Sequence, residues 1–410
     1  MKKVIFVCLC ALLVCSSTTA QSLDDLFVSA LEQNPGLLAK YKAFEIALEQ
    51  VDQTGVLPDP TFSAGYFISP VETRVGPQRA KFSLSQMFPW FGTLKAEKNV
   101  SALRADARYQ EFIEARNLIY FNLSSAYYPL LELNDQIEFE KSNIEILETY
   151  KAIATIKYEN GQTSLTDILR IELMLNESST TIQILEKEKY PLKSMLGSMV
   201  NLPAEQIQVG PDSLVWEPIA VGYKKDSLLI DNPVLTKLEL NEATSKAQES
   251  IILKRGLPKV GVALDYMVVG ERTDMELPDN GKDAIMPMIS LSIPLNRKPY
   301  KSAFREAELQ QERIALERLD FTNTLTTNYE MSWFEIEKQQ ELIRLYEDQL
   351  RDNEQILRLL MSEYSNSGEE FEEVLRVQRK VIDIKKKRSN AIAKGKIALA
   401  KIDYLTAGNR

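Results

Sequence analysis

The sequence predicts a mainly α-helical fold with transmembrane β-strands and an internal duplication. Two hairpins of alternating polar and apolar residues are each followed by a helical stretch too long for an ordinary globular domain. The landmarks of the first copy recur about 200 residues later, a period that indicates a duplicated domain, since solenoid units repeat every 20–50 residues or so. The recurring landmarks are Asn34-Pro35 with Asn232-Pro233, Leu57-Pro58 with Leu257-Pro258, and Tyr158 to Gly161 with Tyr364 to Gly368.

The first 20 residues are expected to be a secretory signal peptide. Lys2 and Lys3 precede an apolar run at 4–14, and small residues lead up to Ala20, where cleavage is expected. The apolar run is too short to cross a bilayer as a helix, which needs about 20 residues.

Composition argues against an enzyme. All three cysteines lie in the signal segment and the chain contains no histidine, so the mature protein lacks thiolate and imidazole chemistry. We therefore expect no catalytic residue, no cofactor and no metal site. The net charge of −9 falls to −11 without Lys2 and Lys3, which argues against nucleic-acid binding. The one basic run, at 385–388, is expected to be a solvated helix face.

The duplication defines the expected domain organisation. The first repeat, 21–200, should contain a helix, a hairpin at 60–88, a long helix at 92–158 and a return helix at 163–200. A connector rich in Pro and Gly follows at 201–225. The second repeat, 226–410, should contain a helix, a hairpin at 259–294, a long helix at 302–364 and a return helix at 369–405.

Each hairpin strand alternates strictly, the period of a strand with one apolar and one polar face. Strands of about 9–11 residues can cross a bilayer when tilted. A soluble sheet alternates in the same way, but strands within an exported, otherwise helical chain favour the membrane. The aromatic residues at 88–91 are expected at the membrane boundary, or in ordinary packing at that junction. The residues expected to face lipid are Phe62, Tyr66, Phe82, Leu84, Val262, Leu264, Tyr266, Ile289, Leu291 and Ile293.

The long helices have a coiled-coil character. At about 1.5 Å per residue, the stretch 92–158 would extend about 100 Å, and Pro129 within it is expected to produce a kink. The second long helix carries two adjacent apolar stripes, one through Ile343 and Tyr346 and one through Leu345 and Ile356. A two-helix coiled coil needs one seam. Two seams indicate neighbours on both sides, as in a closed ring, although a plain helical bundle shares the pattern.

Taken together, these features resemble the TolC family of outer-membrane efflux proteins over essentially the whole mature chain. The resemblance is carried by the paired Asn-Pro and Leu-Pro motifs, by Ser-Leu-Ser strands that end in Phe-Pro or Ile-Pro, and by the Tyr-to-Gly turns. It implies a homotrimer in which each chain gives four strands to a twelve-stranded outer-membrane barrel and its helices to a periplasmic tunnel. It also implies that the channel conducts passively to the exterior. A pump in the inner membrane supplies the energy, and a periplasmic adaptor joins the pump to the channel.

The resemblance also bears on the substrate. The segment 86–94 looks like the branch associated with heavy-metal efflux, although the mature chain has no His or Cys to recognise a soft metal. Metal-ion efflux, drug efflux and a secretion-like role stay open, as does a soluble periplasmic coiled-coil scaffold whose hairpins bind a partner. Detergent dependence separates a membrane barrel from a scaffold.

The turns at the ends of the long helices are the expected functional tips. An adaptor is expected to contact Tyr158, Gly161, Asp167, Tyr364 and Gly368. Acids at the start of a helix favour its dipole by about 0.3–1 kcal/mol each. Repeated around a narrow pore, they would also attract cations, so we expect a gate at Glu369, Glu370, Glu372 and Glu373. The family often has Arg shortly before the tip glycines. In this chain Lys157 and Glu363 occupy those positions, so any salt bridge at the gate should involve different partners.

Overall fold

The computed structural model describes residues 21–210, 214–217, 231–276, 278–367 and 371–407. The expected signal peptide lies outside them. The chain divides into two compact units, each described by itself below. The helical unit comprises Met1–Ala39, Ile113–Asn232 and Asn323–Arg410, and the strand unit comprises Lys40–Phe112 and Pro233–Thr322.

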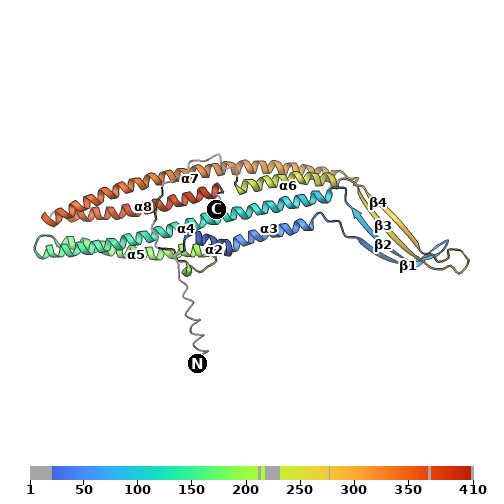
Figure 1. Cartoon of the computed structure of the whole chain (residues 1–410), viewed down its shortest axis with the longest axis horizontal. Coiled ribbons are helices and arrows are strands. Elements are labelled where there is room, and N and C mark those ends of the chain that lie inside the picture. Colours follow the sequence, from blue (N-terminus) through green and yellow to red (C-terminus); the bar gives the residue numbers. More distant parts are fainter. Residues whose placement is uncertain (1–20, 211–213, 218–230, 277, 368–370, 408–410) are drawn as a thin grey trace, which may run out of the picture. The chain divides into compact units, whose positions relative to one another are not determined.

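The strand unit contains one antiparallel sheet with the strand order β1-β2-β3-β4 (Figure 1). Its strands are β1 (Thr61–Thr73), β2 (Gly76–Phe88), β3 (Lys259–Val269) and β4 (Ala284–Ser292). β2 and β3, from different copies of the repeat, pair along their length and join the two hairpins into one surface. β1 and β4 are the edges of this sheet in the described chain.

The helices match the two-copy pattern. Helix α4 is Thr93–Glu159 and α7 is Lys298–Ser367, with the return helices α5 (Leu165–Val200) and α8 (Phe371–Leu405). α7 begins four residues before the expected start and ends three after the expected end. α4 contains Pro129 within its span, where a proline removes one hydrogen bond of the ladder and bends the helix, so the kink expected there stays a prediction. No helix among the described residues combines the length and the apolar character needed to cross a membrane.

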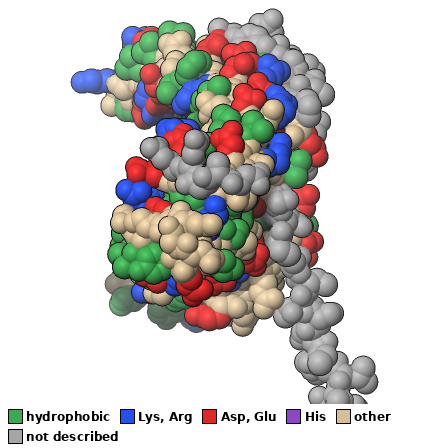
Figure 2. Space-filling view, turned by 90° about the vertical axis from the view of Figure 1, so that its left-hand side faces the viewer, with side chains coloured by type: hydrophobic (Ala, Val, Ile, Leu, Met, Phe, Trp, Pro, Cys, Tyr) green, Lys and Arg blue, Asp and Glu red, His purple; other side chains and the backbone are tan. Residues whose placement is uncertain are grey.

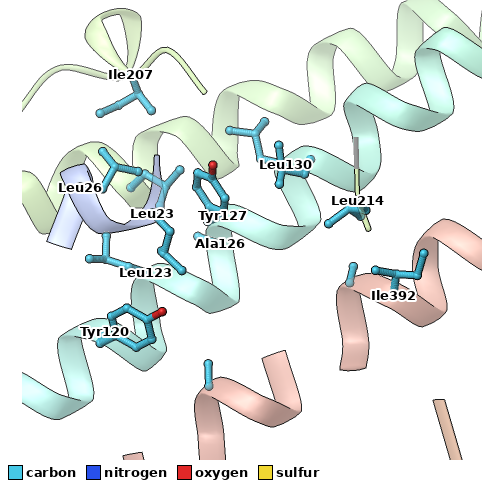
Figure 3. Packing of buried hydrophobic residues seen from close by; sticks show 14 of the residues in the cluster. Leu23, Leu26, Tyr120, Leu123, Ala126, Tyr127, Leu130, Ile207, Leu214 and Ile392 are labelled. Carbon is cyan, nitrogen blue, oxygen red and sulfur yellow. The ribbon is translucent and has the colours of Figure 1, made fainter. Parts of the chain in front are cut away.

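The main core of the helical unit forms where the first helix, α2 (Leu23–Gln33), meets α4. Leu23 and Leu26 pack beside Leu123 and Tyr127 of α4 (Figure 3). Further side chains reach the same cluster from α8 and from the connector, including Ile392, Ile207 and Leu214. The connector contains one short 3₁₀ turn, Ala204–Gln206, in its described part.

The Asn-Pro landmark explains why the first helical stretch is two helices. Asn34 is extended, with φ −67° and ψ 115°, between α2 and α3 (Pro35–Gln53), because a residue before proline disfavours the helical conformation. Its Oδ1 accepts a hydrogen bond from Leu37 N at 2.9 Å, and its Nδ2 donates to Met199 O at 2.8 Å. In the second copy, Asn232 Nδ2 donates to Leu405 O at 3.0 Å, just before α6 (Pro233–Arg255). Each Asn thus joins the start of an entry helix to the end of a return helix.

We expect Asn34→Ala and Asn232→Ala each to lower the free energy of unfolding by about 1 kcal/mol, the typical cost of a lost cap or buried hydrogen bond. The check is urea unfolding of the full-length protein in detergent. Asn160→Ala is the control, because Asn160 bonds only to Ile156 O on an exposed surface. If all three variants unfold at the same urea concentration, the hydrogen bonds of Asn34 and Asn232 to the return helices do not stabilise the fold.

The basic run at 385–388 is not a plain solvated face, so that interpretation is wrong. Lys386 pairs with the buried Glu140 of α4, and Arg388 Nη2 lies 2.7 Å from Glu347 Oε1 of α7. Lys386 and Arg388 thus connect α8 to α4 and α7, whereas Lys387 is half exposed and pairs with Asp383 of α8 itself. A buried hydrogen-bond network joins α8, α4 and α5. Gln378 donates to Asn143 at 2.8 Å, and Asn143 donates to Ser178 at 3.0 Å.

Candidate functional site

The sheet has two chemically different faces. In the register, Phe62 lies opposite Leu84, Leu84 opposite Leu264, and Val262 opposite Ile289, so the predicted apolar residues share one face across all four strands. Ile293 lies one residue beyond the end of β4. All ten are exposed in the single chain. Monomeric soluble proteins rarely expose so large a continuous apolar surface.

The opposite face is polar and contains an ion pair that the sequence analysis missed. Lys81 Nζ lies 2.5 Å from Asp265 Oδ2, and Ser83 Oγ donates to Asp265 Oδ1 at 2.5 Å. The Asp265 side chain is fully buried, at 0% exposure, whereas Lys81 is 37% exposed. The sequence placed all three residues on the polar face, but only the β2–β3 register brings them together. An apolar face backed by a polar one is the arrangement of a membrane barrel wall.

The first helical tip is built around a glycine turn. Gly161, between α4 and α5, has φ +69°, a left-handed conformation that favours glycine. Ser164 Oγ accepts a hydrogen bond from Thr166 N at 3.0 Å and so caps α5. Thr163 Oγ1 donates to Asp167 Oδ2 at 2.6 Å. Tyr158 is exposed at this turn.

The second tip differs, because its tyrosine is buried. Tyr364 is 2% exposed, and its ring centroid lies 4.5 Å from that of Phe371. Lys157 of the first tip places its ammonium 4.3 Å from the Tyr364 ring centroid and donates to the Tyr364 backbone oxygen. The sequence predicted that Lys157 has a different partner from the arginine usual in the family, and in the structure its partner is Tyr364. Burial of the Tyr364 side chain in this cluster raises the pKa of its hydroxyl.

The described acids of the second tip are paired with arginines. Glu372 Oε2 lies 2.8 Å from Arg170 Nη1, and Arg376 Nε donates to Glu373 Oε2 at 2.8 Å. The hydrogen bond from Arg376 lowers the pKa of Glu373. Figure 2 views this end of the helices and shows Lys and Arg beside Asp and Glu side chains. Gly368, Glu369 and Glu370 lie outside the described residues.

Metal ligands do not cluster in the described part of the chain. Among its described residues, no three His, Cys, Asp or Glu side chains converge on a position that could hold a metal ion. Glu372 and Glu373 at the second tip are engaged in ion pairs instead.

Solved structures of outer-membrane proteins share this fold. VceC, an outer membrane protein of Vibrio cholerae, aligns with a TM-score of 0.73 and 16% identity over 94% of this chain and 96% of its own. The open state of the MtrE outer membrane channel of Neisseria gonorrhoeae gives a TM-score of 0.74 and 15% identity over 94% and 89%. The CmeC outer membrane channel of Campylobacter jejuni gives 0.73 and 13% over 94% and 85%.

These similar structures are TolC-family channels, so the fold expected from the resemblance is confirmed. No protein-family model matches the sequence, and no curated protein matches it either. At these identities the likeness establishes the fold, and the function has to be argued from the surfaces described above.

Proposed function

We propose that this chain is the outer-membrane channel of an efflux system and conducts substrates passively from the periplasm to the exterior. The observation that carries the proposal is the sheet, with an exposed apolar face on one side and a buried ion pair, Lys81 with Asp265, on the other. Lipid would cover the first face and a water-filled lumen the second. The fold shared with outer-membrane channels supports the same assignment.

The geometry of the sheet supports an oligomer, and the TolC resemblance implies that it is a homotrimer. Four strands cannot close a barrel, because the smallest bacterial barrels have about eight, and open edges at β1 and β4 invite pairing with another copy. Three chains would supply twelve strands, as the TolC resemblance implies. The apolar stripe through Leu345, Ile356 and Leu359 of α7 is exposed in the single chain, which supports a neighbouring helix there. A soluble scaffold would leave both the apolar face of the sheet and this stripe of α7 exposed to water.

The resemblance adds an inner-membrane pump and a periplasmic adaptor as partners. We assign the adaptor contact to the tip surface at Tyr158, Gly161 and Asp167, whereas the buried Tyr364 would position the second turn and Gly368 lies outside the described residues. We assign the cation-selective gate to the acids at 369–373. The substrate, a drug or a metal ion, would be chosen mainly by the pump, since a duct discriminates by size and charge.

The direct test of the proposed function is conductance of the purified protein in planar bilayers, together with its fractionation with the outer membrane. Discrete channels and detergent-dependent extraction are expected. A protein that stays in the soluble fraction after lysis and forms no channels would support the scaffold instead.

The gate assignment is tested by Glu372→Gln. This change removes the carboxylate 2.8 Å from Arg170 Nη1 and leaves Arg170 only Asp167, at 3.9 Å, as an acidic partner among the described residues, so a gate there would lose cation selectivity or gain basal conductance. The matched control is Glu177→Gln, which breaks an equivalent pair between α5 and α8, to Arg379 at 3.2 Å, two turns further along both helices. The measurements are reversal potential and conductance under a salt gradient. If both variants behave like the wild type, the acidic cluster serves only to begin α8.

A further inference from the structure

An open apolar cavity of about 530 Å³ lies in the strand unit where β2 leads into α4. This volume is within the range of ligand pockets, about 300–1,000 Å³. Its wall is formed mainly by Leu57, Phe88, Trp90, Phe91, Leu94 and Val260, and Lys95 also lines it. Phe91 is 87% exposed, so a large part of the aromatic surface has no partner within the strand unit.

The cavity continues the apolar face of the sheet. Phe88 and Val260 are opposite each other in the β2–β3 register, and both belong to the same face as Leu84 and Leu264. Along β3 the exposed apolar surface runs from Leu264 through Val262 to Val260 at the cavity, whereas on β2 the polar Gln86 lies between Leu84 and Phe88 on this face. The apolar surface ends at Trp90, a residue type enriched where hydrocarbon meets the polar boundary of a membrane.

Two ammonium groups at this junction have no carboxylate partner. The neighbouring charges are paired, with Lys98 to Asp52 at 3.3 Å and Arg255 to Glu97 at 2.8 Å. In the part of the chain that the structure describes, neither Lys95 nor Lys254 forms an ion pair. Lys254 Nζ donates instead to the backbone oxygen of Gly92, a cavity residue, at 3.1 Å. Positive charge beside an apolar cavity is complementary to a lipid phosphate.

We infer that this junction binds one phospholipid with an anionic headgroup, with an acyl chain against Phe88 and Val260 and the headgroup beside Lys95. The inference rests on the proposed membrane function of the sheet. A second copy of the chain is the other conceivable occupant. The cavity, however, lies at β2 and β3, the two central strands, whereas a second copy that completes the sheet would join at the edges β1 and β4.

The test uses the fluorescence of Trp90 in full-length protein in which Trp216→Phe and Trp333→Phe remove the other two tryptophans. The protein is reconstituted in phosphatidylcholine vesicles that contain brominated phosphatidylglycerol or, at equal mole fraction, brominated phosphatidylcholine. We expect the anionic lipid to quench with an apparent affinity about fivefold higher, the factor expected of one Lys at an anionic surface. Lys95→Gln should abolish this preference.

Lys259→Gln is the matched control, because Lys259 adjoins Val260 but belongs to the opposite face of the sheet, so the preference should persist. Equal quenching by the two lipids, or a preference that survives Lys95→Gln, would overturn the lipid site while leaving membrane insertion intact. A Lys95→Gln variant that loses its trimer but keeps its lipid preference would assign the cavity to a neighbouring copy. If neither lipid quenches Trp90 and the protein stays out of the vesicles, the proposed membrane function itself fails.

Discussion

Leu264→Arg is expected to prevent assembly of the protein in the outer membrane. Leu264 lies in the middle of β3, opposite Leu84 and Pro287 on the exposed apolar face. An arginine at mid-bilayer on a lipid-facing strand costs roughly 2–4 kcal/mol per chain, and every chain of an oligomer would carry the cost. The measurement is the heat-modifiable fraction of the protein on gels, together with its recovery in outer-membrane fractions.

The adjacent change Ala263→Arg provides the control. Ala263 has its side chain on the opposite face, where it pairs with Ser85 and Met288, so the new cation would lie in the polar lumen. Leu291→Arg and Ser290→Arg form a second pair of the same kind on β4. If the two faces tolerate arginine equally well, the assignment of the apolar face to lipid is wrong.

Lys81→Met is expected to lower the unfolding midpoint of the protein. It leaves the Asp265 carboxylate, whose side chain has no exposed surface, without its cation, and an unpaired carboxylate destabilises the folded state. Because Lys81 is partly exposed on the face proposed to line the lumen, water screens the pair and reduces the effect. The measurement is the urea or thermal midpoint of the reconstituted protein.

The double variant Lys81→Met with Asp265→Leu should recover most of this loss, because a hydrophobic replacement of both partners is often close to neutral. Lys259→Met is the single-charge control. It removes a cation from the same polar face, where the described residues offer Lys259 no ion-pair partner, and should have little effect. A double variant no more stable than Lys81→Met would show that the pair does not account for the loss.

The local pattern of the chain was enough to predict the strands, their two faces and the long helices. Alternation with a period of two assigns a side chain to one face or the other without knowledge of its partner, which is why the apolar set from Phe62 to Leu291 lies on one face of the sheet, while contact of that face with lipid stays a prediction. The tip glycines located the ends of the long helices to within a few residues, whereas the break at Asn34-Pro35, which divides the expected first helix into α2 and α3, was not predicted. The repeated landmarks indicated the two-copy organisation for the same reason, since each is a local feature.

The tertiary structure decided which residues meet. Ser83 and Asp265 are 182 positions apart, and Lys157 and Tyr364 are 207 apart, so no periodicity could pair them. Tyr158 and Tyr364, which occupy equivalent positions in the two copies, have opposite environments. Tyr364 is buried against Phe371 and Lys157, while Tyr158 is exposed. A sequence pattern determines the face on which a side chain lies, but its partner depends on long-range packing, and the ion pairs at the basic run and at Glu372 depend on that packing too.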